Sequence, residues 1–297
     1  MTKQNVYSDL GSTMKEFRET RGITLEAASF GTSVSVLSRF ERGESNLSNT
    51  ALNAVMTNIG VAPSDLRIDS LMFHSPFIKA LGRIKALRVG LPVAKARVAA
   101  ADYRRDTADH AYFMRDLNVA VFDWMIDSFA ANEELRMPAT LQRQIAHVLI
   151  DGHVWGMYDF NLYSFVMDFL DTDLIVAAYK SMRNHEHFQA GTRYADDIAF
   201  VLWHVGVALT MRGADDMLPV VEGDLLRFRD AMTDRQGPLL SNLVLAVVRQ
   251  KLAPGAASDA RLQLALKAPQ IIGMDHLAEY CQLLVAKAHG AKTGVII

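Results

Sequence analysis

Serines and arginines alternate with apolar residues between Ser29 and Gly43. A turn at Gly31 precedes serines able to cap a helix, and the helix that follows is predicted to have one apolar and one polar side. Short hydroxyls and guanidinium groups suit the base edges and phosphates of a DNA major groove. The residues predicted to face DNA are Ser33, Val34, Ser35, Ser38, Arg39 and Arg42. The alternative interpretation is a short bundle helix whose polar side is solvated.

The other residues that could catalyse a reaction or bind a metal do not form the pattern of an enzyme. His185 and His187 are two positions apart, so on a helix they point away from each other and do not form a zinc site. His147, Asp151 and His153 are explained by a polar helix end. The sequence contains no glycine-rich phosphate loop and no Gly-x-Ser-x-Gly elbow, so we predict no catalytic residue, metal or cofactor.

Composition indicates a folded protein of about two domains. The chain has 297 residues, of which 50% are hydrophobic and 22% charged. Cys281 is the single cysteine, which excludes an intrachain disulfide and fits a reducing compartment; a small buried apolar residue is its expected role. No signal-peptide core or membrane-length apolar run is present, so a cytoplasmic protein with no membrane partner is expected.

Charge is distributed unevenly along the chain. Residues 1–69 hold 7 Lys/Arg and 8 Asp/Glu, residues 70–110 hold 8 and 3, and residues 111–297 hold 16 and 22. Binding to nucleic acid is therefore expected to be local, because phosphate neutralisation requires clustered cations. The basic middle segment is interpreted as the solvated side of two helices. The alternative is contact with the DNA backbone, or with an acidic group of a ligand or partner subunit.

Apolar spacing and turn residues predict five short helices before residue 70. Their expected ranges are 9–20, 24–28, 33–42, 48–59 and 63–66. Thr24 is the expected N-cap of the second, Ser33 or Ser35 of the third, and Gly60 ends the fourth. Arg18 and Arg21 are predicted to reach phosphates beside the groove, and Glu41 to pair with an arginine of its own domain.

These residues resemble a known family. Segments 22–28 and 37–45 resemble the helix-turn-helix of the Cro/repressor type, and the Ser-Arg-Phe-Glu-Arg-Gly-Glu-Ser string starting at Ser38 is similar to the Rgg family of peptide-responsive regulators. A second match is Trp-Gly-Met-Tyr-Asp-Phe-Asn-Leu at 155–162, which resembles the Trp-Gly-Tyr-Tyr-Glu-Leu segment of the family, with Met157 and Asp159 in place of the usual Tyr and Glu. Trp155 and Tyr158 are expected to pack between neighbouring helices.

Residues 70–297 are predicted to form a second, all-α domain, a degenerate tetratricopeptide-like stack of helical hairpins with a groove suited to an extended peptide. Helices are expected at 112–129, 138–150, 155–169, 173–182, 194–211, 217–232, 238–252, 261–266 and 275–288, with breaks that include Pro269. Amides can pair with a peptide backbone and arginines with its carboxylate. The candidates are Arg83, Asn118, Asn161, Arg193 and Asn242.

The resemblance implies a function for the two domains. Residues 1–69 would bind a two-fold operator in double-stranded DNA, and residues 70–297 would bind a short signalling peptide and pair two subunits through their C-terminal helices. The whole would be a homodimeric regulator in quorum sensing. The alternative keeps the DNA-binding domain but assigns the helical domain to a protein partner or a small molecule.

Overall fold

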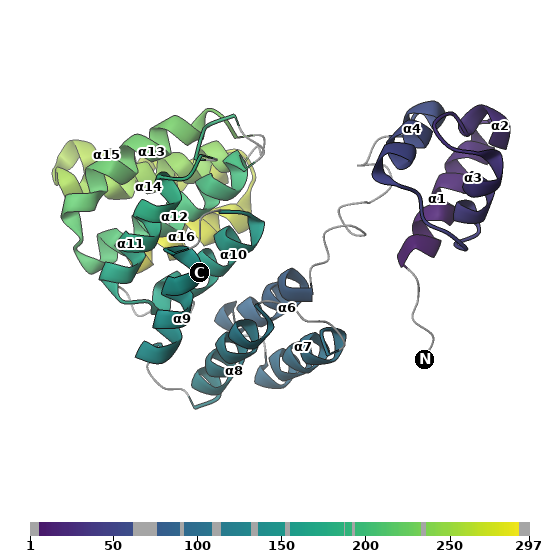
Figure 1. The fold of residues 1–297 in the computed structure, drawn as a ribbon. Coiled ribbons are helices and arrows are strands. Elements are labelled where there is room, and N and C mark those ends of the chain that lie inside the picture. The colour runs from purple at the N-terminus through teal and green to yellow at the C-terminus, as the bar shows by residue number, and fades with distance from the viewer. Residues whose placement is uncertain are drawn as a thin grey trace. The chain divides into compact units, whose positions relative to one another are not determined.

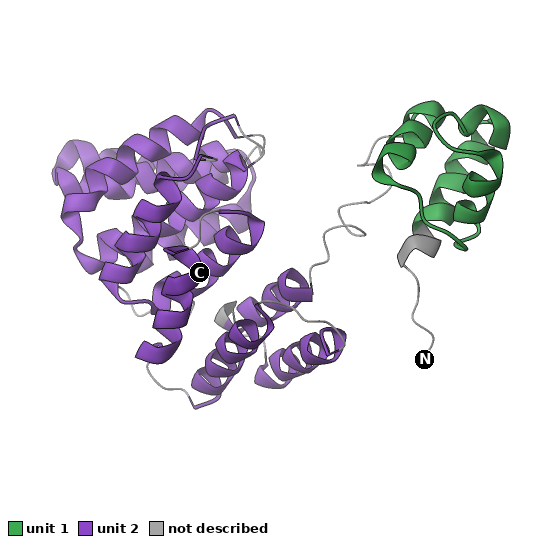
Figure 2. Ribbon diagram, viewed as in Figure 1, with its two compact units in different colours: residues 1–75 green, residues 76–297 purple. Residues whose placement is uncertain are grey.

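The computed structural model describes two compact units, residues 1–75 and 76–297 (Figures 1 and 2). Every secondary-structure element within the described residues is helical. The boundary predicted near residue 70 and the helix predicted at 63–66 fall outside these residues. The described residues are 6–61, 76–89, 92–108, 114–131, 136–151, 155–186, 188–191, 194–232 and 236–290.

The first unit contains four described helices, α1 (Val6–Thr20), α2 (Leu25–Ala28), α3 (Val34–Glu41) and α4 (Asn49–Ile59). Thr24 and Ser33 accept hydrogen bonds as N-caps of α2 and α3, which confirms the predicted starts. Gly60 ends α4 with a φ of 67°, as its position after the apolar run predicted. The local capping pattern therefore determined where these helices begin and end.

The core of the first unit holds α3 against α1. Met14, Leu37 and Phe40 are at most 1% exposed and belong to one apolar cluster. At Gly11 of α1 an added Cβ would lie 2.0 Å from the Phe40 carbonyl oxygen, so the two helix backbones are in direct contact. This packing buries one side of α3 and leaves its other side available to solvent.

The second unit is a longer series of helices joined by short turns. No helix within the described residues is both long and apolar enough to cross a membrane. The α-helices are α6 (Pro76–Ile84), α7 (Val93–Asp106), α8 (Arg115–Ala131), α9 (Ala139–Leu149), α10 (Met157–Val166), α11 (Thr172–Arg183), α12 (Ala195–Arg212), α13 (Leu218–Arg229), α14 (Gly237–Leu252), α15 (Ala256–Ile271) and α16 (Asp275–Ala288). The 3-10 segments are η1 (Lys85–Val89), η2 (Met167–Phe169) and η3 (Asp215–Met217).

Helix α12 forms the centre of this unit, where it packs against α10, α13, α14 and α16. All of residues 201–210 are buried, which explains why the α12 sequence is apolar on every side rather than amphipathic. Neighbouring helices along the chain, such as α6 with α7 and α14 with α15, also pack together. The predicted all-α series of hairpins is confirmed.

The prediction that Pro269 breaks a helix is wrong. Helix α15 begins at Ala256 and continues through Pro269 to Ile271, whereas the sequence pattern predicted only 261–266. Proline removes one backbone donor from a helix interior, but here only two residues of the helix follow it. Pro269 is also buried, so its ring packs in the interior of the unit.

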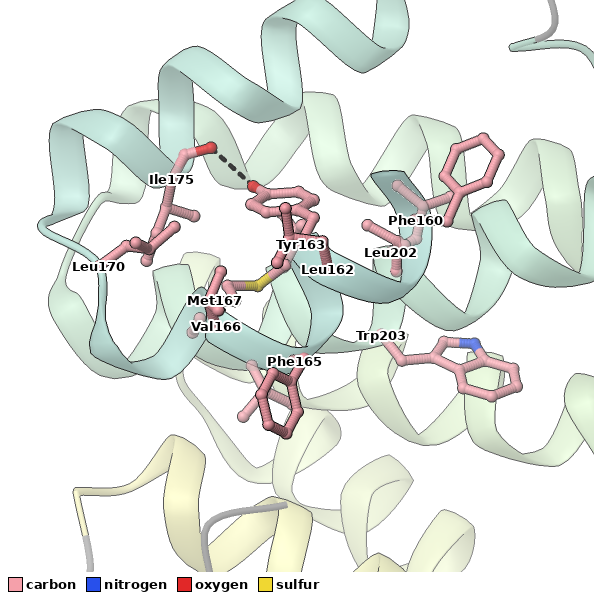
Figure 3. Packing of buried hydrophobic residues seen from close by; sticks show 14 of the residues in the cluster. Phe160, Leu162, Tyr163, Phe165, Val166, Met167, Leu170, Ile175, Leu202 and Trp203 are labelled. Carbon is pink, nitrogen blue, oxygen red and sulfur yellow. Dashed lines mark hydrogen bonds between the residues drawn. The ribbon is translucent and has the colours of Figure 1, made fainter. Parts of the chain in front are cut away.

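The Trp155–Phe160 segment packs as predicted. Trp155 is 2% exposed, and its ring centroid lies 5.7 Å from that of Tyr163. The Tyr163 hydroxyl donates to the Ile175 carbonyl oxygen at 2.7 Å, which joins α10 to α11 (Figure 3). Tyr158 lies 4.7 Å from Phe77 between ring centroids, so it joins α10 to α6. The segment is a packing element of the second unit.

Gly206 offers a test of the α12 packing. An added Cβ there would lie 2.6 Å from Val244 Cγ1, whereas one at Gly223 of α13 would meet no heavy atom within 4 Å. We expect Gly206→Ala to lower the free energy of unfolding by about 1–3 kcal/mol through overpacking. Gly223→Ala, the matched control, is expected to raise it by about 0.5–1 kcal/mol. Urea denaturation measures both, and equal effects of the two substitutions would contradict the packing.

Candidate nucleic-acid interface

The N-terminus of α3 presents a small polar and apolar surface. Ser33 Oγ accepts a hydrogen bond from the Val36 backbone N–H at 3.3 Å and lies 3.1 Å from Ser35 Oγ. Ser33 and Ser35 are exposed, and Val34 is 43% exposed. The first turn of a helix also has backbone N–H groups without intrahelical partners. This end of α3 therefore offers hydroxyls, amide donors and one apolar side chain.

The turn before α3 is held in place by α4. Asn58 Nδ2 donates to the carbonyl oxygens of Ala28 at 3.1 Å and Phe30 at 3.0 Å. Gly31 has a φ of +92°, and an added Cβ there would lie 2.6 Å from Ala54 Cβ. Because α4 contacts the turn at two points, the orientation of α3 is fixed by the fold of the unit.

Two arginines lie in the second half of α3 and at its end. Arg39 is exposed, and the structure records no hydrogen bond or ion pair between its side chain and another described residue. Arg42 instead forms a two-point ion pair with Glu44, at 2.7 and 2.8 Å, and donates to Ser38 Oγ at 2.5 Å. The predicted polar side of α3 is thus present. Of its two arginines, Arg42 is hydrogen-bonded within the protein, whereas no hydrogen bond to another described residue is recorded for the side chain of Arg39.

Arg18 does not belong to this surface, and the prediction that it reaches phosphates is wrong. It is 7% exposed, and its Nε and Nη2 donate to the Glu41 carboxylate at 2.7 and 2.8 Å. Its Nη1 donates to the Ile23 carbonyl oxygen at 2.9 Å. The expected partnership of Glu41 with an arginine of its own domain is confirmed, and it joins α1 to α3.

The side chain of Arg21, which is predicted to reach phosphates, also makes hydrogen bonds within the protein. Its Nη1 donates to the carbonyl oxygens of Ile59 and Gly60, the latter at 2.7 Å, and so satisfies the C-terminal end of α4. The residue remains exposed, so a phosphate contact through its other N–H groups stays a prediction.

Sequence reasoning did not select three residues of this surface. Phe30 is 79% exposed in the turn before α3. Glu44 holds Arg42, and Asn58 holds the turn. The signal for Phe30 was an aromatic residue beside the turn glycine, and the signal for Glu44 was a carboxylate directly after Gly43. Asn58 gave no local signal, because its partners lie 28 and 30 residues away.

The basic segment of the second unit is largely paired with acids. Arg83 lies 3.2 Å from Asp102, Arg97 lies 2.9 Å from Asp127, and Arg104 pairs with Asp123. Such exposed pairs contribute little stability, but they reduce the net positive charge available to phosphates. The interpretation of this segment as a solvated surface agrees with the observed pairing.

The predicted peptide-binding residues do not converge on one groove. Asn118 is 2% exposed, donates to the Tyr103 hydroxyl at 2.9 Å and accepts from the Tyr158 hydroxyl at 2.7 Å. Its amide is therefore engaged within the core, which contradicts its assignment to a peptide. Arg193 lies outside the described residues.

The other two amides have nearby partners. Asn161 donates to the carbonyl oxygen of Met157 one turn earlier at 2.8 Å. Asn242 is exposed on α14, and its Oδ1 lies 3.4 Å from Arg229 Nη1. Asn242 and Arg83 are the members of the predicted set that the structure exposes to solvent.

The second unit also has cavities that the sequence pattern did not indicate. One cavity, of about 530 Å³, lies between α12, the start of α14 and the α15–α16 turn. Another, of about 510 Å³, borders α11 and includes Lys180 and His185. The walls of the first are formed by Phe200, Trp203, Gln236, Leu240, Gly273, Met274, Asp275, His276, Leu277 and Tyr280.

The structure gives no support to chemistry at Cys281 or the histidines. Cys281 is fully buried, and burial raises the pKa of its thiol to about 11, so the reactive thiolate is disfavoured at neutral pH. This confirms the expected role as a small buried residue. His187 lies outside the described residues, and within them no group of three His, Cys, Asp or Glu side chains is arranged to hold a metal ion.

Comparison with known proteins identifies the fold. The sequence matches no family model, and no curated protein matches it. Among solved structures, the chain is similar to the pheromone receptor Rgg2 of Streptococcus dysgalactiae, with a TM-score of 0.68, 16% identity, and coverage of 94% of this chain and 99% of that one.

Two further solved structures have a similar fold. PrgX in its complex with cCF10 has a TM-score of 0.71 at 14% identity, covering 94% of this chain and 99% of that one. A bacterial peptide pheromone receptor complex has a TM-score of 0.70 at 14% identity, covering 96% and 99%. The resemblance to the Rgg family indicated by the sequence motifs is confirmed at the level of the fold.

Proposed function

We propose that this chain is a cytoplasmic transcription regulator of the Rgg type that binds double-stranded DNA through α3. The observation that supports this most directly is the exposure of Ser33, Val34, Ser35 and Arg39 on a helix whose opposite side is buried against α1. Hydroxyls and arginines at this position suit phosphates and base edges, and Val34 suits a thymine methyl group.

The regulator would act as a homodimer on a two-fold operator. One short helix contacts too few base pairs for useful specificity, so two copies of α3 about 34 Å apart are expected. Selection of binding sites from random duplexes with the full-length chain tests this. Recovery of an inverted repeat supports the proposal, whereas a chain that enriches no sequence would contradict DNA-binding regulation.

We assign the second unit to a short apolar signalling peptide. Two observations support this assignment: the 530 Å³ cavity lined mainly by apolar and aromatic side chains, and the fold shared with a peptide pheromone receptor. Asn242, Arg83, Asn161 and Arg193 remain proposed contacts to the peptide outside this cavity, since Arg83, Asn161 and Asn242 do not line it. The peptide would control DNA binding only if it binds the active and inactive dimers with different affinities.

A thermal-shift screen of the full-length protein distinguishes the partner classes. A peptide present at a hundredfold excess over its Kd is expected to raise the melting temperature of the second unit by about 5 to 10 °C. The probes are short apolar peptides encoded beside the gene, and each is paired with its reversed sequence as control. Silence with all peptides, together with a shift by small molecules or a partner protein, would favour the alternative function.

A further inference from the structure

The end of α3 is closed by a turn that brings Glu44 back over the helix. Arg42 is the C-cap residue, and Gly43 has a φ of +73°, a left-handed conformation that favours glycine. The Glu44 backbone N–H then donates to the Arg39 carbonyl oxygen at 2.8 Å. This geometry places the Glu44 side chain beside the guanidinium group of Arg42.

Arg42 is held at three points. Its Nε lies 2.7 Å from Glu44 Oε1, and its Nη2 lies 2.8 Å from Glu44 Oε2, the two-point geometry that matches a guanidinium to a carboxylate. Its Nη1 donates to Ser38 Oγ at 2.5 Å, one turn earlier on α3. Of the five N–H groups of the guanidinium, three are used and two remain for a ligand.

The ion pair between Arg42 and Glu44 contributes little to the stability of the fold. Both side chains are 50% exposed, and ion pairs at such sites contribute little to folding because water screens them. The pair nevertheless persists over a wide pH range, because the hydrogen bonds and charge of Arg42 lower the pKa of the Glu44 carboxyl. Its physical effect is to cancel the charge of Arg42 and to fix the direction of its remaining N–H groups.

We propose that Glu44 is a positioning residue that withholds the charge of Arg42 from phosphates and presents its two remaining N–H groups, in fixed orientation, to an acceptor on a specific DNA sequence. This inference rests on the proposed function of α3. Arg42 would then contribute to sequence discrimination, whereas Arg39, which interacts with the Glu44 carboxylate only through its charge and has no hydrogen bond or ion pair to it, would provide the more available charge.

Glu44→Gln tests the proposal, because it removes the negative charge with little change in size. Binding of the full-length protein to its selected duplex and to a random duplex of equal length is measured by fluorescence anisotropy at several salt concentrations. We expect random-duplex affinity to rise about three- to tenfold, and its logarithmic salt slope to steepen by about one, as for one additional phosphate contact. The ratio of specific to random affinity should fall about tenfold.

Two controls separate positioning from a general change in charge. Glu26→Gln removes an equal charge from an exposed residue of α2 and is expected to leave the specificity ratio within twofold. Glu44→Gln in an Arg42→Ala background should likewise leave the specificity ratio within twofold of that of Arg42→Ala alone. An unchanged ratio and slope in Glu44→Gln, or the same changes in either control, would overturn the inference while the selected site still supported the proposed function. A wild-type chain that selects no duplex would instead overturn the proposed function and, with it, this inference.

Discussion

Combined substitution of Arg39→Ala and Ser38→Ala is expected to weaken binding to the selected duplex about 30- to 1000-fold. Arg39 is exposed on α3, and Ser38 lies one residue before it, beside the guanidinium of Arg42. A specific side-chain contact to a base typically contributes about 1–3 kcal/mol, so loss of two contacts costs about 2–4 kcal/mol in affinity. Gel-shift titration of the full-length protein at one fixed salt concentration measures the change.

The matched control is Lys15→Ala on α1. Lys15 is an exposed cation of the same unit, 3.9 Å from Glu19, and its removal lowers the net charge by the same amount as removal of Arg39. We expect it to leave discrimination between selected and random duplexes unchanged. If the Arg39/Ser38 double variant kept both affinity and selectivity, α3 would not be the DNA-binding helix.

Breaking the buried Arg18–Glu41 ion pair should strongly destabilise the first unit. The two side chains are 8% and 5% exposed. Arg18→Ala leaves the buried Glu41 carboxylate without its partner, and Glu41→Gln leaves Arg18 with Glu19, at 3.3 Å, as its remaining carboxylate contact. We expect Arg18→Ala or Glu41→Gln to lower the unfolding free energy of residues 1–75 by about 3–5 kcal/mol. Hydrogen exchange measured by mass spectrometry on the full-length chain reports this unit separately from the rest.

Two further variants show whether the loss of stability comes from an unpaired buried charge or from the loss of the ion pair itself. The apolar double variant Arg18→Met with Glu41→Leu is expected to recover most of the stability, because a well-packed apolar pair avoids the desolvation of two charges. Lys15→Ala, which removes an exposed cation and leaves both carboxylates beside Arg18 in place, should change stability by less than about 1 kcal/mol. If Arg18→Ala left exchange unchanged but weakened DNA binding, Arg18 would be a DNA contact after all.

Helix positions were largely predictable from the sequence because their signals are local. Thr24 and Ser33 cap helices through hydrogen bonds to residues three positions later, and Gly60 ends α4 through a conformation that only its own backbone must adopt. The failure at Pro269 has the opposite cause. Pro269 is buried and lies in the last turn of α15, where only two residues of the helix follow it, and burial depends on how the helices pack.

The binding residues were harder to predict, since residue type does not show which side chains are already engaged. Asn118 was selected as a free amide in an apolar helix, but its partners Tyr103 and Tyr158 lie 15 and 40 residues away. The cavity beside Trp203 and Leu277 likewise joins helices distant in the chain. Sequence spacing contains no direct information about such contacts.

The arginines of the first unit show most clearly what the sequence determined and what the tertiary structure decided. The sequence alone determined that α3 exists, where it starts and ends, and that hydroxyls and arginines lie on one side, because caps, glycine turns and apolar spacing act within a few residues. Only the tertiary structure decided that the guanidinium group of Arg18 is already engaged and buried. Arg18 is paired with Glu41 across 23 residues. The pairing of Arg42 with Glu44, two positions later, is local, and Arg39 is exposed. The physical reason is that a guanidinium binds the first well-placed carboxylate, and chain packing determines where that carboxylate lies.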